Sequence, residues 1–292
     1  MTIAALALPA VLAGCSGPWN DPYTAQEAGK NILYSSFSER PKHLDPVQSY
    51  AENEAVFTAQ IYMPPLQYHY LKRPYELTTL AATEVPRPVY YDASDHRLPD
   101  TSPGNKVAYS IYEIHIQKGI MYQPHPAFAR DESGKLRYHA LKREDLKHVY
   151  ELRDFKYIGT RELLADDYAF QIRRLAHPKL HSPIFGLISE YIVGLKDYAA
   201  KLQQAARTTA AGGYLDLMQF PLDGVQVVDS HTYRIKLKGQ VSAVRLLARD
   251  AFLLADPLGG GALLLSAGYV RRKESLAGLV SGGHRGLHAD AQ

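Results

Sequence analysis

Apolar and polar residues alternate along two parts of the chain, which is the pattern of β-strands with one buried face. The first part is residues 107–116, VAYSIYEIHI. The second is residues 224–237, where the alternation continues on both sides of DSH at residues 229–231 and predicts a hairpin. A shorter strand is predicted at residues 31–37, and the prolines in residues 38–46 indicate that a loop follows it.

Apolar residues recur at helical spacing in three other parts of the chain, residues 54–62, 166–177 and 184–206. Asp166 and Asp167 stand at the start of the second segment, where acidic residues cap a helix and complement its dipole, and Pro178 ends it. The third segment is expected to break near Gly194. Because strands and helices alternate along the chain, we predict an α/β fold.

The composition is that of a globular protein of 292 residues, 46% of them hydrophobic and 22% charged. Its 33 basic and 30 acidic residues are interspersed, which leaves a net charge of +3 and no indication of nucleic-acid binding. The chain has 21 Tyr against 8 Phe. Tyrosine suits half-exposed sheet positions as well as the rims of ligand-binding clefts.

The N-terminus carries an apolar run at residues 3–12, which is shorter than the roughly 20 residues of a membrane-spanning helix. It fits the central part of a secretory signal, although no Lys or Arg precedes it. Residues 12–15, LAGC, resemble a bacterial lipobox, which implies cleavage before Cys15 and a lipid anchor on this cysteine. The alternative is a free, buried Cys15 on an N-terminal helix, which Pro9 and Gly14 disfavour.

The known catalytic and phosphate-binding motifs are missing from the sequence: it has no Gly-rich phosphate loop, HExxH or GxSxG. His177 and His181 are four residues apart, but Pro178 separates them, and two ligands alone do not make a zinc site. Asp166 and Asp167 are adjacent on a predicted helix and therefore point apart. We predict no catalytic residue, no metal site and no cofactor, and hence a protein that is not an enzyme.

Four segments carry short motifs in a fixed order between residues 30 and 240. They are HLDP in residues 37–46 with QIYMPPL at residues 60–66, YEIHIQKGIMY at residues 112–122, ELLADDYAFQIRRL at residues 162–175, and the hairpin at residues 224–237. Together these motifs resemble the extracellular solute-binding proteins of family 5, the dipeptide-, oligopeptide- and nickel-binding subunits of bacterial ABC importers. Met63 replaces the usual Glu of the family, and residues 70–105 are interpreted as an insertion.

The resemblance implies a two-lobed α/β protein that closes around its ligand. Residues 30–240 would form an incomplete periplasmic-binding-protein lobe of type II, a mixed sheet with flanking helices. The implied function is that of a periplasmic substrate-binding subunit, anchored through Cys15, that passes oligopeptides or another small solute to permease subunits in the inner membrane. A secreted lipoprotein enzyme or envelope-structure protein with an α/β body is the alternative.

By position in the family, the loop after the first predicted strand faces the ligand. Its candidate ligand-binding residues are Ser36, Ser38, Glu39 and Arg40. Proteins of this kind hold peptides through backbone hydrogen bonds and by charge capture of the termini, for which Glu39 and Arg40 offer both signs. The alternative is an ordinary solvent-exposed loop.

The composition changes after Gly239. Before it the sequence is varied and rich in Tyr, and after it the tail consists mostly of Leu, Ala, Gly, Arg and Ser. Codons that can encode this tail also encode, when read one nucleotide later, segments such as LSLDWYPVGTGAYML. These segments resemble the part of the family sequence that follows the hairpin. We therefore expect a frameshift near residue 240 and a truncated fragment unable to bind a ligand. The expected division is a lipoprotein signal at 1–15, a tether at 16–29, a binding-domain part at 30–240 and an out-of-frame tail at 241–292.

Overall fold

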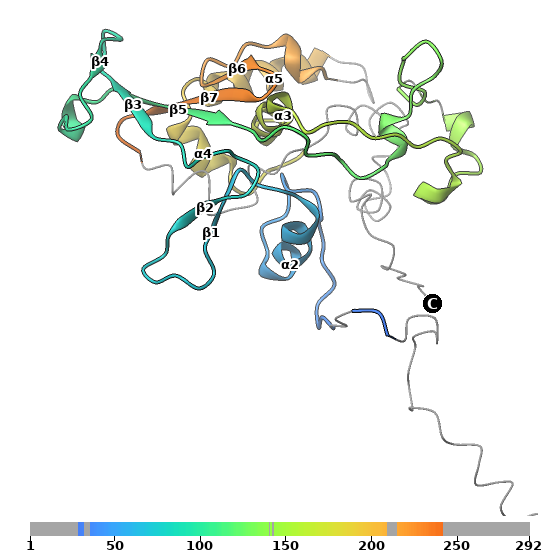
Figure 1. Ribbon diagram of the computed structural model, residues 1–292. Helices are drawn as coiled ribbons and strands as arrows, with labels where there is room; N and C mark the ends of the chain where they lie inside the picture. Colours follow the sequence, from blue (N-terminus) through green and yellow to red (C-terminus); the bar gives the residue numbers. More distant parts are fainter. Residues whose placement is uncertain (1–28, 32–35, 140, 142, 209–214, 242–292) are drawn as a thin grey trace, which may run out of the picture. The chain divides into compact units, whose positions relative to one another are not determined.

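The computed structural model describes residues 29–31, 36–139, 141, 143–208 and 215–241, which are drawn in colour in Figure 1. The chain divides into two compact units, residues 1–38 and residues 39–292. The described residues of the first unit include Gly29, with a φ of 86°, and the exposed Phe37. All helices and strands described below lie in the second unit. Among the described residues, no helix combines the length and the apolar character that crossing a membrane requires.

A five-stranded sheet is the centre of the second unit (Figure 1). Its strands are ordered β4-β3-β5-β7-β6, and each described pair is antiparallel. The strands are β3 (Pro88–Tyr91), β4 (Arg97–Leu98), β5 (Tyr109–His115), β6 (Val225–Asp229) and β7 (Thr232–Lys238). The full length of β5 pairs with β7, so two segments that are far apart in the chain become neighbours.

The strands predicted from alternation are present, and the alternation has the expected cause. On β5, Tyr112 and Ile114 are buried, while the residues between them are half-buried on the other face. On β7, Tyr233, Ile235 and Leu237 are buried in the same way. Because side chains alternate between faces, one face of both strands contributes to the core. The β6–β7 hairpin confirms the turn predicted at residues 229–231.

The three predicted helical segments are confirmed with small shifts at their ends. They form α2 (Glu52–Ile61), α3 (Ala165–Leu175), α4 (Phe185–Tyr191) and α5 (Leu195–Thr208). The predicted break near Gly194 separates α4 from α5. Gly194 has a φ of 75°, a left-handed conformation that glycine adopts without the strain of a side chain.

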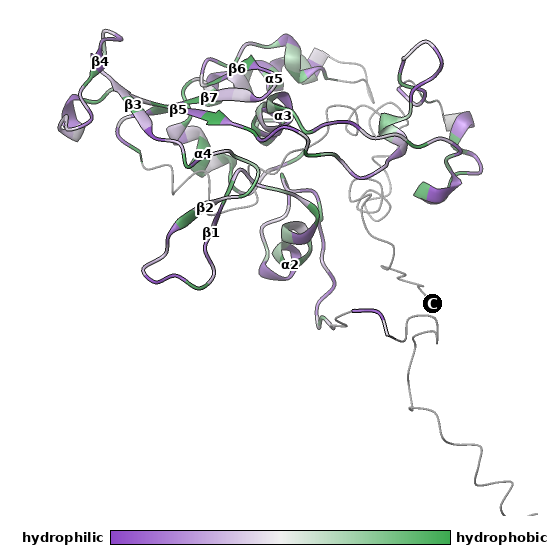
Figure 2. Ribbon diagram, in the orientation of Figure 1, coloured by the Kyte–Doolittle hydropathy of each residue, from purple (hydrophilic) through white to green (hydrophobic). Residues whose placement is uncertain are grey.

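One hydrophobic core joins the helices to the sheet. Helix α3 packs against β6 and β7, and α4 packs against β7 and α5. Figure 2 shows hydrophobic and hydrophilic residues together on α3 and β5, as expected for elements with one buried face. The fully buried side chains include Tyr168, Ile172, Leu195, Tyr198 and Leu202. The predicted α/β class is therefore confirmed.

The stretch interpreted as an insertion, together with the residues just before it, holds short strands that the sequence analysis did not predict. Strand β1 (Leu66–Tyr68) pairs antiparallel with β2 (Leu77–Thr79) in a separate two-stranded sheet, and β3 and β4 extend the main sheet. These strands have two to four residues. Runs this short carry too few alternating positions to be recognised by periodicity.

Short 3₁₀ helices occur in the connecting segments. They are Gly104–Lys106, Pro126–Phe128, Arg143–Leu146, Leu152–Asp154 and Leu217–Gln219. Several predictions lie wholly or largely outside the described residues: the signal with Cys15, the tether, the strand at residues 31–37 and the tail beyond residue 241.

Candidate functional site

Helix α3, which belongs to the third motif segment, contacts the first motif segment at two points. Near its C-terminal end, the guanidinium of Arg174 binds the carboxylate of Asp45 in the HLDP motif through two contacts of 2.7 and 3.1 Å. Near its N-terminal end, the hydroxyl of Tyr168 donates a 2.8 Å hydrogen bond to the carbonyl oxygen of Met63. The two halves of the first motif segment are thus fixed to one helix.

The same helix contacts the β6–β7 hairpin, which is the fourth motif segment. The rings of Tyr168 and Tyr233 are stacked, with centroids 5.6 Å apart and an interplanar angle of 12°. The backbone amide of Ala165 donates a 2.8 Å hydrogen bond to the carbonyl oxygen of Ser230 in the hairpin turn. Tyr168 therefore joins the first and fourth motif segments at a buried position.

Glu162, just before α3, joins the second motif segment to the fourth. Its Oε1 accepts a 2.6 Å hydrogen bond from the amide of Gly119 and lies 3.1 Å from Nε2 of His231. The Gly119 amide, followed by His231, lowers the pKa of Glu162 below its usual value. The amide of Leu163 also donates to the carbonyl oxygen of Ile120 over 2.8 Å. We call α3 and these contacts, made by residues 161–177 with the other three motif segments, the α3 junction.

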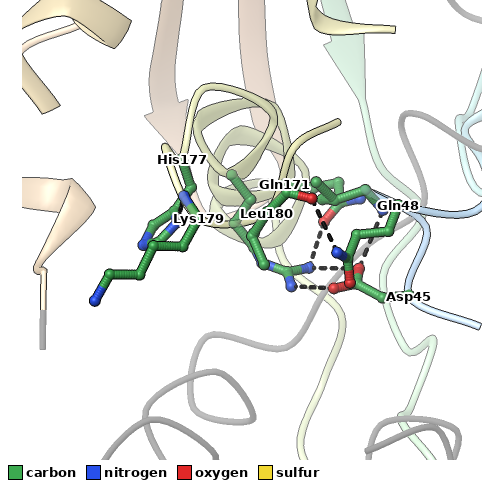
Figure 3. A network of polar contacts seen from close by, with 8 residues as sticks. Asp45, Gln48, Gln171, His177, Lys179 and Leu180 are labelled. Atoms are coloured by element: carbon green, nitrogen blue, oxygen red, sulfur yellow. Dashed lines mark hydrogen bonds and ion pairs between the residues drawn. The ribbon is translucent and has the colours of Figure 1, made fainter. Parts of the chain in front are cut away.

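The loop that carries the HLDP motif is held in place by a network of polar contacts, shown in Figure 3. Arg174, besides pairing with Asp45, donates a 3.1 Å hydrogen bond to the side-chain oxygen of Gln171. Three residues beyond Asp45, the side chain of Gln48 donates to the carbonyl oxygen of Leu180 over 2.9 Å. These contacts anchor the loop at two places on α3 and the segment that follows it.

A second carboxylate anchors both ends of the same loop to helix α2. Glu54 is 3% exposed, and its oxygens accept hydrogen bonds from four backbone amides, those of Lys42, His43, Tyr50 and Ala51, over 2.8 to 3.2 Å. Burial acts to raise the pKa of Glu54, but these donors outweigh it, so that the pKa lies below its usual value. A single side chain thus holds the loop closed.

Within the acidic pair at the start of α3, Asp167 takes part in the predicted cap, and it also forms an ion pair that was not predicted. Asp167, which is fully buried, accepts a 3.0 Å hydrogen bond from the amide of Leu164. It also forms a two-contact ion pair with Arg161, in which Nη1 lies 2.9 Å from Oδ2. The pKa of Asp166 is raised, mainly by burial and then by the charge of Asp167.

The two histidines considered as metal ligands do not form a metal site in the structure. His177 is buried, and its Nδ1 accepts a 3.2 Å hydrogen bond from the amide of Lys179. Burial, followed by the charges of Arg174 and Lys179, lowers the pKa of His177 to about 4, so the ring is neutral at pH 7. His181 has a φ of 49° and is exposed. No group of three or more possible metal ligands occurs within the described residues.

The candidate ligand-binding residues are all exposed. Ser36 and Ser38 belong to the first unit, and Glu39 and Arg40 belong to the second. The structure therefore groups them in two pairs and assigns no common geometry to all four. The carbonyl oxygen of Glu39 accepts a 3.4 Å hydrogen bond from the side chain of Asn53 on α2. Their role in ligand binding stays a prediction.

The polar groups that hold the HLDP loop and the start of α3 were not singled out in the sequence. Glu54, Arg161 and Arg174 each act on a partner whose position depends on the fold. A weak signal exists for Glu54, since an acidic residue in the first turn of a helix often accepts from backbone amides before it. These contacts hold the HLDP loop and the start of α3 in place. The carboxylates and guanidinium groups that make them are bound to other groups of the fold.

No family model matches the chain. No curated protein matches it either. Solved structures do: the Escherichia coli murein tripeptide-binding protein MppA is matched with a TM-score of 0.45 and 15% identity, over 77% of this chain and 30% of that protein. Peptide-bound OppA of Listeria monocytogenes is matched with a TM-score of 0.42 and 12% identity, over 76% and 30%.

A third match, OppA of Haemophilus influenzae in complex with a peptide, has a TM-score of 0.41 and 16% identity, over 75% of this chain and 29% of that one. This chain spans about 30% of the length of the structures that it matches. By their names these are binding proteins rather than enzymes. The solved structures similar to this chain are thus peptide-binding proteins of solute-binding family 5, the family that its motif segments resemble.

Proposed function

We propose that residues 30–240 are part of the substrate-binding subunit of an ABC importer, and that the ligand of the whole subunit is an oligopeptide. One observation carries this proposal. The motif segments that resemble the family in sequence are also adjacent in space, because the α3 junction joins all of them through Asp45, Met63, Gly119 and Tyr233. The ligand class follows from the family resemblance.

We propose that the segment at residues 36–40 contributes to the ligand site. Glu39 and Arg40 are exposed and oppositely charged, so they can capture the amino and carboxyl termini of a peptide. The chain is anchored immediately after them, since Glu54 binds the amides of Lys42 and His43. Anchoring on one side reduces the conformational entropy that these residues lose when a ligand binds.

We also propose that residues 241–292 are read out of frame. The change of composition after Gly239 supports this proposal. The nucleotide sequence of the gene tests it directly. Translation of residues 241–292 in the frame shifted by one base should give the family-like segments, and a different amino-acid sequence in that frame contradicts the frameshift. The binding role is tested separately by isothermal titration with a defined peptide pool. A protein made from the frame-restored gene should bind, and this chain should show no binding heat.

A matched pair of variants in the frame-restored protein assigns the ligand site. Arg40→Gln should weaken peptide binding about tenfold or more, because a charged hydrogen bond to the ligand is lost. Arg153→Gln removes an exposed arginine elsewhere and should leave affinity unchanged. Absence of binding by the restored protein contradicts the peptide proposal, and equal affinities of the two variants contradict the role of Arg40.

We propose a periplasmic location, a lipid anchor on Cys15, and permease subunits of the inner membrane as partners. The signal-like run and the LAGC motif support the anchor. Metabolic labelling with a fatty acid, followed by membrane fractionation, should show a labelled protein in the membrane fraction. The substitution Cys15→Ser should abolish this labelling. Label that persists in this variant contradicts the anchor.

A further inference from the structure

The β1–β2 hairpin ends in a tip, residues 68–76, that presents large side chains to solvent. Tyr70, Leu71 and Tyr75 are 80%, 69% and 66% exposed. Figure 1 shows the hairpin extending away from the five-stranded sheet. Single exposed apolar residues are common on proteins, but three within six positions of one projecting loop form a local apolar surface.

The root of this hairpin is fixed to the body of the protein. Leu66 is 1% exposed, and Ala81 and Ala82 are fully buried in the main core. The side chain of Gln117 donates to the carbonyl oxygens of Leu80 and Ala82 over 3.1 and 2.9 Å. The hairpin is therefore attached to the core at its base.

The tip itself is held open by contacts among its own residues. The rings of Tyr68 and Tyr75 meet edge to face at 5.6 Å across the base of the loop. The guanidinium of Arg73 lies 4.2 Å from the centroid of the Tyr75 ring and donates to the carbonyl oxygens of Tyr70 and Lys72. These contacts hold the tip in one conformation in which Tyr70 and Leu71 are exposed. The tip therefore loses less conformational entropy when it binds a partner.

The charge and size of the tip decide between possible partners. Residues 68–76 contain two cations, Lys72 and Arg73, against one carboxylate, Glu76, which pairs with Lys72 over 2.6 Å; the tip therefore has one positive charge in excess and favours an anionic surface. Aromatic side chains bury roughly 150 to 250 Å² each, so the two tyrosines together with the smaller Leu71 offer on the order of 500 Å². A stable protein interface needs about 800 Å² per partner. A lipid bilayer accepts a small apolar projection flanked by cations and aromatic rings.

We propose that the hairpin tip is a peripheral membrane contact that inserts Tyr70 and Leu71 into the headgroup region of an anionic bilayer, with Lys72 and Arg73 at the lipid phosphates. Binding of this kind increases with buried apolar area and with attraction to anionic lipids. The contact uses residues other than those of the proposed peptide site and is argued independently of it. It would orient the body of the protein toward the membrane surface.

A tryptophan placed in the tip tests the proposal in the full chain. Leu71→Trp keeps the tip apolar, and its fluorescence, after subtraction of the wild-type signal from Trp19, should shift to the blue with phosphatidylglycerol vesicles and be quenched by brominated lipid. Tyr150→Trp, at a position that is 76% exposed elsewhere, should show neither effect. An unshifted, unquenched signal from Leu71→Trp overturns the proposal.

Sedimentation with vesicles measures how much the tip contributes to binding. Tyr70→Ser with Leu71→Ser should lower the partition coefficient on phosphatidylglycerol vesicles about tenfold or more. Lys72→Gln, which leaves the contacts of Arg73 within the tip in place, should lower it several-fold there and leave it unchanged on phosphatidylcholine. Tyr150→Ser with Ile158→Ser removes comparable exposed apolar groups and should have no effect. Equal losses for the tip and this control contradict the proposal.

Discussion

The α3 junction and the β1–β2 hairpin tip are built from the same kinds of side chain. Each has a pair of tyrosine rings 5.6 Å apart, Tyr168–Tyr233 in the junction and Tyr68–Tyr75 in the tip. Each also has an ion pair and a histidine. In the junction Tyr168, Tyr233, Asp167 and His177 are buried, whereas in the tip Tyr75 and the Lys72–Glu76 pair are exposed and Tyr68 and His69 are half-buried. Because the two regions differ in burial more than in residue type, we expect burial to decide which of these contacts stabilise the fold.

The buried ion pair of the junction provides the sharpest test of this difference. Asp167→Asn leaves Arg161 without its anionic partner and weakens the cap on Leu164. Because breaking a buried pair is strongly destabilising, we expect a loss of about 3 kcal/mol in the free energy of unfolding, measured with urea. The control Asp197→Asn, at an exposed site in the first turn of α5, should lose about 0.5 kcal/mol. Equal losses would contradict the comparison.

The histidines of the two regions should differ in their effect on pH dependence. The pKa of His177 is lowered from 6.5 to about 4, so below pH 6.5 the unfolded chain binds a proton that the folded chain does not. Stability should therefore fall by about 2 kcal/mol as the pH falls from 6.5 to 4. His177→Gln should remove this part of the pH dependence, measured by urea unfolding across the pH range.

The matched control for this experiment is the histidine of the tip. His69 is stacked on Tyr70 in the half-buried part of the exposed loop, and His69→Gln should leave the fall in stability between pH 6.5 and pH 4 in place. The assignment to His177 would be wrong if His69→Gln and His177→Gln changed the pH profile equally.

The stacked tyrosines of the junction allow a comparison within one buried site. The hydroxyl of Tyr168 donates to Met63, and Tyr168→Phe should cost about 1 kcal/mol. The hydroxyl of Tyr233 is buried and has no hydrogen-bond partner among the described residues, so Tyr233→Phe should leave stability unchanged or increase it slightly. The midpoints of urea unfolding of Tyr168→Phe and Tyr233→Phe, measured side by side, test these two expectations. A larger loss for Tyr233→Phe would refute the assignment.

The exposed ion pair of the tip should have the smallest effect. Lys72 and Glu76 are 2.6 Å apart, but their side chains are 54% and 55% exposed. Exposed pairs contribute little because water screens them and two flexible side chains lose entropy. Glu76→Gln should therefore change the free energy of unfolding by less than about 0.5 kcal/mol, with little dependence on salt. A loss comparable to that of Asp167→Asn would show that the tip contributes to the core.

Much of the fold could be predicted from periodicity, and the reason lies in particular residues. Tyr112 and Ile114 alternate with polar residues over a seven-residue strand, which is long enough for the pattern to be recognised. Strands β1 to β4 are too short for such a pattern, and β3 begins with Pro88, a residue usually taken as a strand breaker. Strand β3 pairs with the longer β5 and β4 pairs with β3, whereas β1 and β2 pair with each other, so the formation of these strands depends on partners and not on their own pattern.

The candidate site could be predicted only in part. The role of the loop with Glu39 and Arg40 in ligand binding stays a prediction from the motif order, and the contacts that anchor this loop were not predicted. Asp45 and Arg174 are 129 positions apart, and no local pattern connects them. Glu54 was seen only as a helical residue, because the four amides that it binds converge only when the loop closes.

The sequence by itself determined the longer strands and helices, the motif order and the change of composition after Gly239, since these depend on local spacing and residue type. Only the tertiary structure decided which polar groups meet. A carboxylate such as Asp45 or Asp167 acquires its role from the desolvated partner placed beside it, and the exposed rings of Tyr70 and Tyr75 acquire theirs from the absence of a covering segment within the described residues. Electrostatic contacts depend on distance and burial in three dimensions, which a one-dimensional pattern does not contain.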